Sequence, residues 1–143
     1  MQKFLLVIAV VFAFVAQPVM ANEIGRVKNV TAGGVEVVRG DTTYTATAGF
    51  RLHEGDRIST RRGQTVGITF IDNTRISVAP RTRMIVSRYL FDRADGSGES
   101  VMEVQRGAIG VDTGRLSATG NMRFKTPSST LGVRGTTFVI EVG

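Results

Sequence analysis

The sequence predicts an all-β protein, a single compact β-sandwich or roll of about 10–12 short strands. Short runs rich in valine, isoleucine, threonine and phenylalanine recur along the chain and are separated by glycine, aspartate and asparagine. This is the pattern of short strands joined by tight turns, and no segment shows the apolar period of an amphipathic helix. A short β-solenoid-like stack of strands fits the same pattern, so it remains the alternative architecture.

Individual strands follow from alternation and from the turns between them. Apolar side chains at every second position of Thr65–Ile71 would share one face of a strand. Gly33-Gly34, Gly55-Asp56 and Asp72-Asn73 suit tight turns, because glycine tolerates positive φ and aspartate bonds to nearby backbone. We expect strands at Gly25–Thr31, Val35–Arg39, Thr42–Ala46, Arg57–Ser59, Thr65–Ile71, Arg75–Val78, Thr82–Phe91, Ser100–Arg106, Gly110–Asp112, Asn121–Lys125 and Thr136–Val142.

The amino terminus predicts a secretory signal peptide over residues 1–21. A positive charge at Lys3 precedes an uninterrupted apolar run, Phe4–Ala16, and small or aliphatic residues then lead to a cut between Ala21 and Asn22. The run has 13 residues, and a helix of that length rises only about 20 Å, which is short of the roughly 30 Å hydrocarbon core. We therefore expect a mature chain that does not span the membrane and that is periplasmic or secreted.

The predicted mature chain, residues 22–143, has the length of one domain. The sequence contains no cysteine, so disulfides cannot stabilise this domain and cysteine metal sites are excluded. Apolar burial and the β ladder must hold the fold together. A lipid-anchored lipoprotein is excluded as well, because no cysteine follows the apolar run.

The chain is basic, with 18 lysines and arginines against 12 acidic residues. A secreted protein rarely meets nucleic acid, so we expect no nucleic-acid partner. Anionic cell-envelope glycan, lipid head groups or an acidic protein surface would suit the charge better. The arginines are spread along the chain, and the nearest approach to patches is Arg57, Arg61 and Arg62, followed by Arg75, Arg81 and Arg83.

The residues of enzyme sites are missing. His53 is the only histidine; it cannot make a zinc site alone, and no nucleophile motif surrounds any serine. Asp92–Ser100 does not match the spacing of a calcium-binding loop. We therefore expect no enzyme activity, no catalytic residue, no cofactor and no metal.

Asp92–Ser100 is the longest polar stretch and predicts an exposed, mobile hairpin loop. Its charged residues are the candidates for contact with a partner: Asp92, Arg93, Asp95 and Glu99.

Several short motifs occur in the sequence in a recognisable order. Gly25-x-Val27 and Val35-x-Val37-x-Arg39 are followed by a Gly-x-x-Leu-x-x-Gly-Asp element that ends at Gly55 and Asp56. An alternating stretch then runs from Val66 through Asp72 to Pro80. The chain closes with Thr126-Pro127 and Leu131-Gly132-Val133-Arg134-Gly135-Thr136. In this order the mature chain resembles the FecR domain, named for the regulator of ferric citrate uptake.

We expect the motif residues to have mainly structural roles. Asp56 would cap the turn that Gly55 allows, and Pro127 would force Thr126 into extended geometry at a strand end. Gly132 and Gly135 flank Val133 and Arg134 and would let the backbone pass close to its neighbours, with Thr136 following. A buried Arg134 would need a carboxylate partner. Candidates for that partner are Asp56, Asp72 and Asp112.

The resemblance implies an extracytoplasmic signalling module. In the regulator for which the family is named, this domain relays the occupancy of an outer-membrane transporter to a cytoplasmic sigma factor. In this chain a predicted signal peptide takes the place of a cytoplasmic arm, and the sequence stops at Gly143, so we expect a stand-alone binding module. Two hypotheses remain open: an envelope protein partner held by a sheet edge or by Asp92–Ser100, and an anionic glycan or lipid held by arginines.

Overall fold

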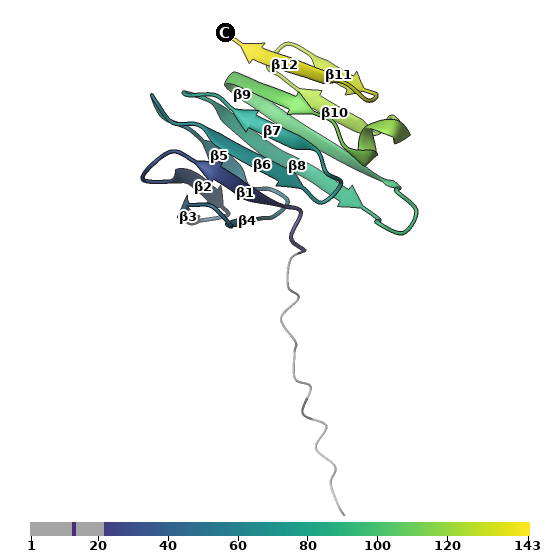
Figure 1. Ribbon diagram of the computed structural model, residues 1–143, viewed down its shortest axis with the longest axis horizontal. Coiled ribbons are helices and arrows are strands. Elements are labelled where there is room, and N and C mark those ends of the chain that lie inside the picture. Colours follow the sequence, from purple (N-terminus) through teal and green to yellow (C-terminus); the bar gives the residue numbers. More distant parts are fainter. Residues whose placement is uncertain (1–12, 14–21) are drawn as a thin grey trace, which may run out of the picture.

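The computed structural model describes residues 13 and 22–143, so the predicted signal peptide lies, apart from Ala13, outside the described residues. The domain is all-β, as expected, and its strands join into one 12-stranded sheet (Figure 1). No helix in the described chain is long and apolar enough to cross a membrane. The strands are β1 (Gly25–Val30), β2 (Val35–Arg39), β3 (Thr42–Ala46), β4 (Arg51–Leu52), β5 (Arg57–Ser59), β6 (Val66–Phe70), β7 (Arg75–Val78), β8 (Arg83–Phe91), β9 (Gly98–Asp112), β10 (Met122–Lys125), β11 (Thr130–Val133) and β12 (Thr137–Val142), with one short 3-10 helix, η1 (Arg115–Thr119).

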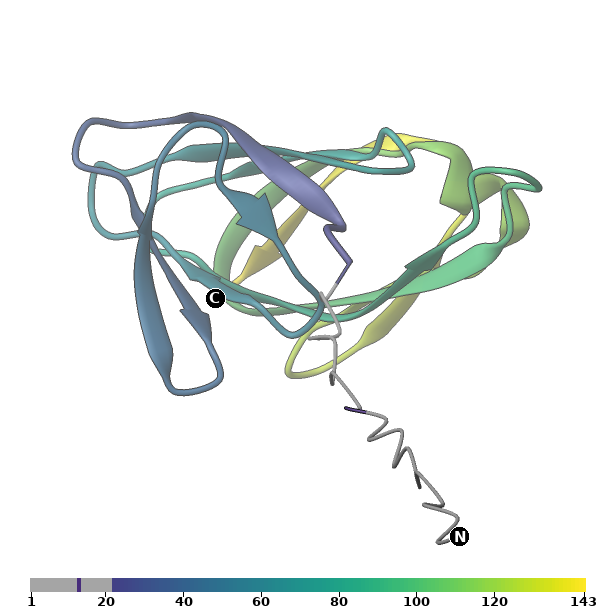
Figure 2. The same cartoon turned by 90° about the horizontal axis from the view of Figure 1, so that it is seen from below.

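The sheet folds over on itself along a long bent hairpin. Strands β7 and β8 pair one after the other with β9, from Arg75 opposite Asp112 to Phe91 opposite Gly98. The half of β9 beside β7 also pairs with β12, and the half beside β8 also pairs with β10. Since β9 belongs to both layers, the sheet curls into a roll (Figure 2). All ladders described are antiparallel except β9–β10. This antiparallel pairing gives a roll rather than a solenoid-like stack of strands.

The bend is fixed by two buried threonines and a glycine. The Thr60 hydroxyl donates to the Ala79 carbonyl at 2.6 Å and accepts the Thr82 N–H at 2.9 Å. The Thr82 hydroxyl accepts the Ala108 N–H at 3.0 Å and donates to the carbonyl of the same residue at 3.1 Å. Gly107 lies opposite with φ +86°. Its missing Cβ leaves room for the backbone of Thr82, so this corner satisfies the backbone groups that the bend removes from the ladder.

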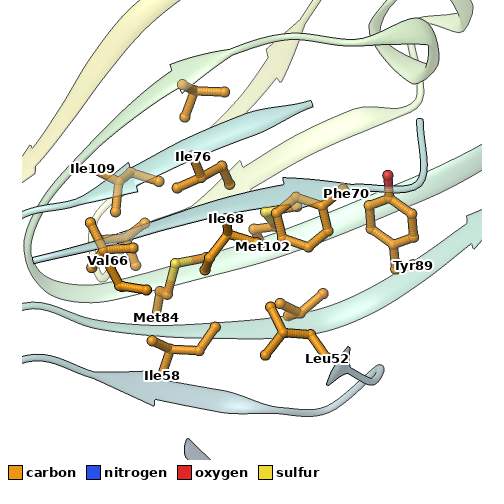
Figure 3. Close-up of a cluster of buried hydrophobic side chains, with 14 of the residues drawn as sticks. Leu52, Ile58, Val66, Ile68, Phe70, Ile76, Met84, Tyr89, Met102 and Ile109 are labelled. Atoms are coloured by element: carbon orange, nitrogen blue, oxygen red, sulfur yellow. The ribbon is translucent and has the colours of Figure 1, made fainter. Parts of the chain in front are cut away.

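Between the layers lies a continuous apolar core (Figure 3). Side chains at alternate positions of β6 point inward, and they meet inward side chains of β8 and β9. The ring of Phe70 stacks on that of Tyr89 with centroids 5.2 Å apart. The buried apolar residues of these three strands are Val66, Ile68, Phe70, Met84, Val86, Tyr89, Met102, Val104, Ile109 and Val111. Apolar burial therefore holds the cysteine-free domain, as expected.

Apart from small shifts at strand ends, four elements differ from expectation. Ser100–Arg106 and Gly110–Asp112 were expected as two strands, but the bend at Gly107 lets the chain continue as the single strand β9. The short strands β4 and β11 were not expected, because neither shows alternation in burial that a sequence pattern could reveal. Helix η1 was also missed; it spans only five residues.

The close packing at this corner predicts that a methyl group at Gly107 would strongly destabilise the fold. A Cβ there would lie 2.6 Å from the Cα of Thr82 and 2.7 Å from the carbonyl oxygen of Arg81. We expect Gly107→Ala to lower the free energy of unfolding by about 3 kcal/mol, from backbone strain plus overpacking. Gly40→Ala is the control, because Gly40 also has positive φ, +56°, but a Cβ added there would have no neighbouring atom within 4 Å; it should cost only about 1 kcal/mol. Urea denaturation measures both, and equal costs would contradict the role of the corner.

Candidate functional site

Asp72 is a buried structural hub. Its carboxylate accepts the N–H of Thr74 at 3.1 Å, the Thr74 hydroxyl at 2.8 Å and the N–H of Leu116 at 3.1 Å. The hydroxyl of Tyr89 donates to the same carboxylate. These bonds tie the turn between β6 and β7 to β8 and to η1 at the end of the roll that lies away from the bend. The structural reading of this motif residue is therefore supported by its contacts.

Asp56 forms the second buried polar centre. Both of its oxygens accept hydrogen bonds from the guanidinium of Arg39, each at 2.8 Å, and the backbone N–H of His53 donates to one of them at 2.9 Å. The guanidinium also lies over the rings of Tyr44 and Phe50, with centroids 5.2 and 5.6 Å away. This bidentate pair ties the β2–β3 hairpin to the turn before β5. His53 contributes only its backbone to these bonds.

Arg134 is not a buried staple. Its side chain is exposed, and its guanidinium packs over Gly120 at the end of η1. Within residues 22–143, Arg134 makes no ion pair. The three candidate carboxylates bind other groups: Asp56 binds Arg39, Asp72 binds Tyr89 and Asp112 binds Arg75. The motif around Arg134 is therefore a surface feature rather than part of the core.

The other motif residues near the carboxyl end lie in a turn, in strand β11 and in the segment after it. Thr126 follows β10, its N–H donates to the Ser129 carbonyl at 2.8 Å, and its hydroxyl accepts the Ser129 N–H at 3.1 Å. Pro127 lies inside this turn, as its fixed φ favours. Most of Thr130–Thr136 is exposed, and Leu131 shows 43% of its surface. The residues that carry the resemblance thus divide into buried aspartates and an exposed carboxyl-terminal segment.

The polar loop is shorter than expected and uses its own carboxylates. The turn spans Asp92–Ser97, because β8 ends at Phe91 and β9 begins at Gly98. The Asp92 carboxylate accepts the N–H of Ala94 at 2.8 Å. The Asp95 carboxylate accepts the Ser97 N–H and hydroxyl at 2.8 and 2.6 Å, and these bonds lower the pKa of Asp95. Both carboxylates therefore stabilise the turn itself.

Glu99 and Ser100 belong to β9 and not to the loop. Glu99 pairs with Arg88 across the β8–β9 ladder, and Ser100 is fully buried. Of the four candidates for partner contact, only Arg93 has a charged group that makes neither an ion pair nor a hydrogen bond in the described part of the chain.

The strongest candidate for an interaction surface is the outer edge of β12. This strand pairs with β9 on one side only, and no other strand among residues 22–143 pairs with its far side. The N–H of Ala79 donates to the Ala108 carbonyl, so even-numbered residues of β9 bond toward β7 and odd-numbered residues bond toward β12. By the register, Thr137, Val139 and Glu141 then turn their backbone N–H and C=O groups to the free edge.

Val139 joins this edge to a shallow groove on the outer face of the sheet. It has 69% of its surface exposed, more than Leu90 at 50%. The register places it beside Gly110, which lies opposite Ser77 and, one strand further, Gly67. Because these three side chains are small or absent, they leave a hollow of about 370 Å³, with Val139 at one side.

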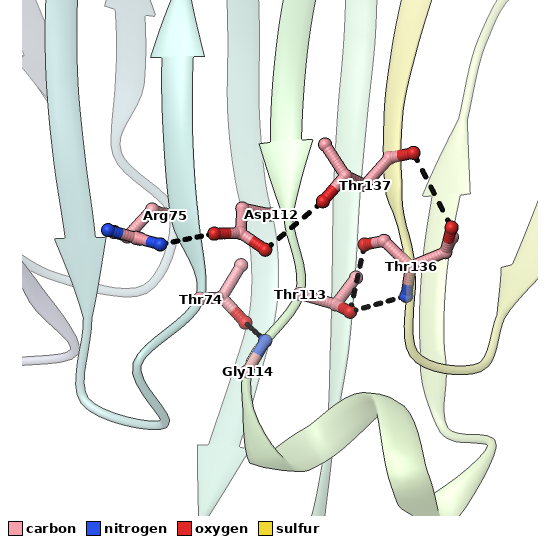
Figure 4. A network of polar contacts seen from close by, with 7 residues as sticks. All are labelled: Thr74, Arg75, Asp112, Thr113, Gly114, Thr136 and Thr137. Carbon is pink, nitrogen blue, oxygen red and sulfur yellow. Dashed lines mark hydrogen bonds and ion pairs between the residues drawn. The ribbon is translucent and has the colours of Figure 1, made fainter.

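The beginning of β12 is held firmly against β9 (Figure 4). The N–H of Thr113 donates to the Thr136 carbonyl at 3.2 Å, and the N–H of Thr136 donates to the Thr113 hydroxyl at 2.8 Å. The hydroxyl of Thr137 lies 3.3 Å from the Asp112 carboxylate, to which it donates, and Asp112 also pairs with Arg75. The free edge is thus presented by a fixed strand rather than a loose terminus.

Sequence reasoning missed Val139 and Tyr89. The alternation of the last strand could have placed Val139 on the outer face with Thr137 and Glu141, but it could not show that the edge is open. Between residues 22 and 143 no cluster of three acidic or histidine side chains could hold a metal ion.

The buried contact between Tyr89 and Asp72 predicts that the folded domain loses stability at alkaline pH. Burial, and secondly the bond to Asp72, raise the pKa of Tyr89 above its usual value of 10.0. Above pH 10.0 the unfolded state loses the phenol proton of Tyr89, whereas the folded state keeps it. The contribution of Tyr89 to the free energy of unfolding is therefore complete below that pH and falls as the pH rises further, by about 1.4 kcal/mol per pH unit.

Tyr89→Phe should lose some stability at neutral pH and lack this alkaline decline. Urea denaturation at about pH 8 and about pH 11 measures the difference. Tyr44→Phe is the control and should decline like the unmodified chain. Parallel declines in all three proteins would contradict the proposed origin of the effect.

A comparison with protein families identifies the family of the chain. The sequence profile described as FecR protein matches residues 56–143, more than half of the chain, from the buried Asp56 to the open strand β12. Strands β1–β4 precede the matched part, although the sequence analysis assigned them to the same domain. No curated protein and no solved structure matches the chain. The chain belongs to the FecR family.

Proposed function

We propose that this chain is a non-enzymatic, periplasmic module of envelope signalling that binds a partner protein through the open edge of β12. Membership of a family of extracytoplasmic signalling regulators supports the general role. The observation that carries the specific proposal is the unpaired edge of a firmly held strand, with an exposed valine at its centre.

An extended segment of a partner suits this edge. The groups of Thr137, Val139 and Glu141 would pair with a partner strand, which supplies affinity without regard to sequence. Specificity would come from the apolar contact with Val139 and from a side chain entering the hollow above Gly110. A long open edge is otherwise a liability for aggregation, so its exposure favours a binding role.

The loop Asp92–Ser97 is the weaker candidate for the same role. Both of its carboxylates already accept hydrogen bonds from their own turn. A partner would have to replace those bonds, whereas no strand among the described residues pairs with the outer edge of β12.

A proline at Val139 tests the edge directly. Its ring removes the outward N–H but leaves the β9 ladder intact, as proline does on sheet edges. We expect Val139→Pro to abolish capture of the partner in a crosslinking pull-down from envelope extract at high salt. Val139→Ala keeps the N–H and should retain a protein of the same mass, with weaker binding.

Two controls make the result decisive. Circular dichroism melting should give similar curves for Val139→Pro and Val139→Ala, because neither change touches the core. Deletion within Asp92–Ser97 should leave capture unchanged. Capture that survives Val139→Pro but is lost with the loop deletion would reject the edge in favour of the loop.

A further inference from the structure

A basic groove surrounds the turn between β6 and β7. Two adjoining hollows of about 430 and 600 Å³ lie there and share Thr69 and Asn73 in their walls. The first reaches the beginning of β1 and the loop after β8, and the second reaches the end of β9 and the beginning of η1. Together they form a concave surface on both sides of Thr69 and Asn73.

The lining of the groove carries more positive than negative charge. Five basic side chains face three carboxylates across the two hollows. The basic residues are Arg26, Lys28, Arg75, Arg93 and Arg115, and the acidic residues are Glu23, Asp72 and Asp112. Of the six arginines that the sequence presented as possible patches, only Arg75 lies here.

The carboxylates are already engaged. Glu23 pairs with Arg26 and lies 3.6 Å from Arg51, and Asp112 pairs with Arg75. Asp72 is fully buried and accepts four internal hydrogen bonds. None of these carboxylates makes an ion pair with Lys28, Arg93 or Arg115.

Of the five basic residues that line the groove, three make no ion pair with any described residue: Lys28, Arg93 and Arg115. Arg115 is held in place, because its guanidinium lies over the ring of Phe91 at 5.2 Å and donates to the backbone carbonyl of Arg93 at 3.4 Å. Stacking and this bond reduce the rotamer entropy that a ligand would otherwise have to remove.

We infer that this groove binds a phosphate-bearing anion through Lys28, Arg93 and Arg115, around Asn73. Guanidinium groups bind phosphate oxygens in pairs, and a lysine adds a point charge. The Thr69 hydroxyl and the Asn73 amide are neutral donors in the same walls. The phosphate could belong to a soluble ester or to a phospholipid head group, and the site needs neither the β12 edge nor its partner.

Titration with pyrophosphate tests the site. The segment Asn22–Gly143 is suitable, because it contains every strand and the whole described core. We expect amide shifts in ¹⁵N NMR spectra at Asn73, Arg93 and Gly114, and weaker binding as salt rises. The double variant Arg93→Gln with Arg115→Gln should bind about tenfold more weakly or worse.

Arg62→Gln with Arg123→Gln is the matched control. Both arginines are exposed and lie outside the groove, and the pair removes the same charge; it should leave binding nearly unchanged. Lys28→Gln is a second test should the double variant melt early. Shifts spread over the whole surface, or equal weakening by both double variants, would overturn the proposal.

Vesicles distinguish the two sources of phosphate. Sedimentation with phosphatidylglycerol vesicles, but not with phosphatidylcholine vesicles, that depends on Arg93 and Arg115 would assign a lipid head group. Pyrophosphate binding without vesicle binding would assign a soluble phosphate ester. Absence of both kinds of binding would reject the site.

Discussion

The bend at Thr82 and Gly107 is the constraint on which the rest of the molecule depends. It lets one hairpin, β7–β8 with β9, supply the centre of both layers, and the two threonine hydroxyls satisfy the backbone groups that the bend disrupts. Because β9 belongs to both layers, its inward side chains fill one core. On the other side of β9, strand β10 pairs with the half beside β8, and strand β12 pairs with the half beside β7. The far edge of β12 is then open among the described residues.

The polar interior and the exposed surfaces have separate roles. Asp56 and Asp72 are buried, fully hydrogen-bonded and tie distant turns together, so they fix the frame on which binding groups are placed. The open edge and the basic groove meet at the beginning of β12, where Thr137 and Arg75 both bind Asp112. A rigid support of this kind keeps the binding groups in place before a ligand arrives.

Sequence reasoning reached the fold class, most strands and the family, since alternation and turn chemistry are local signals. It divided β9 in two, because a glycine inside a bent strand has the same local pattern as a turn. It offered Asp56, Asp72 and Asp112 as partners for a buried Arg134, whereas Arg39, Tyr89 and Arg75 bind them. Pairing between residues so far apart in the chain has no local signal. The grouping of Lys28, Arg93 and Arg115 depends on strand β1, the turn after β8 and helix η1 coming together, which alternation does not reveal either.

Residue-by-residue amide hydrogen exchange tests the central claim, that a bent hairpin carries a firmly paired β12 with an open outer edge. We expect strong protection at the corner, for Ala79 and Ala108, and an alternating pattern along β12. Amides of Phe138, Ile140 and Val142 should exchange slowly, and those of Val139 and Glu141 should exchange fast. Uniform protection along β12 would show that the edge is covered in solution, and uniform fast exchange would show that the strand is not held; either result would contradict the claim.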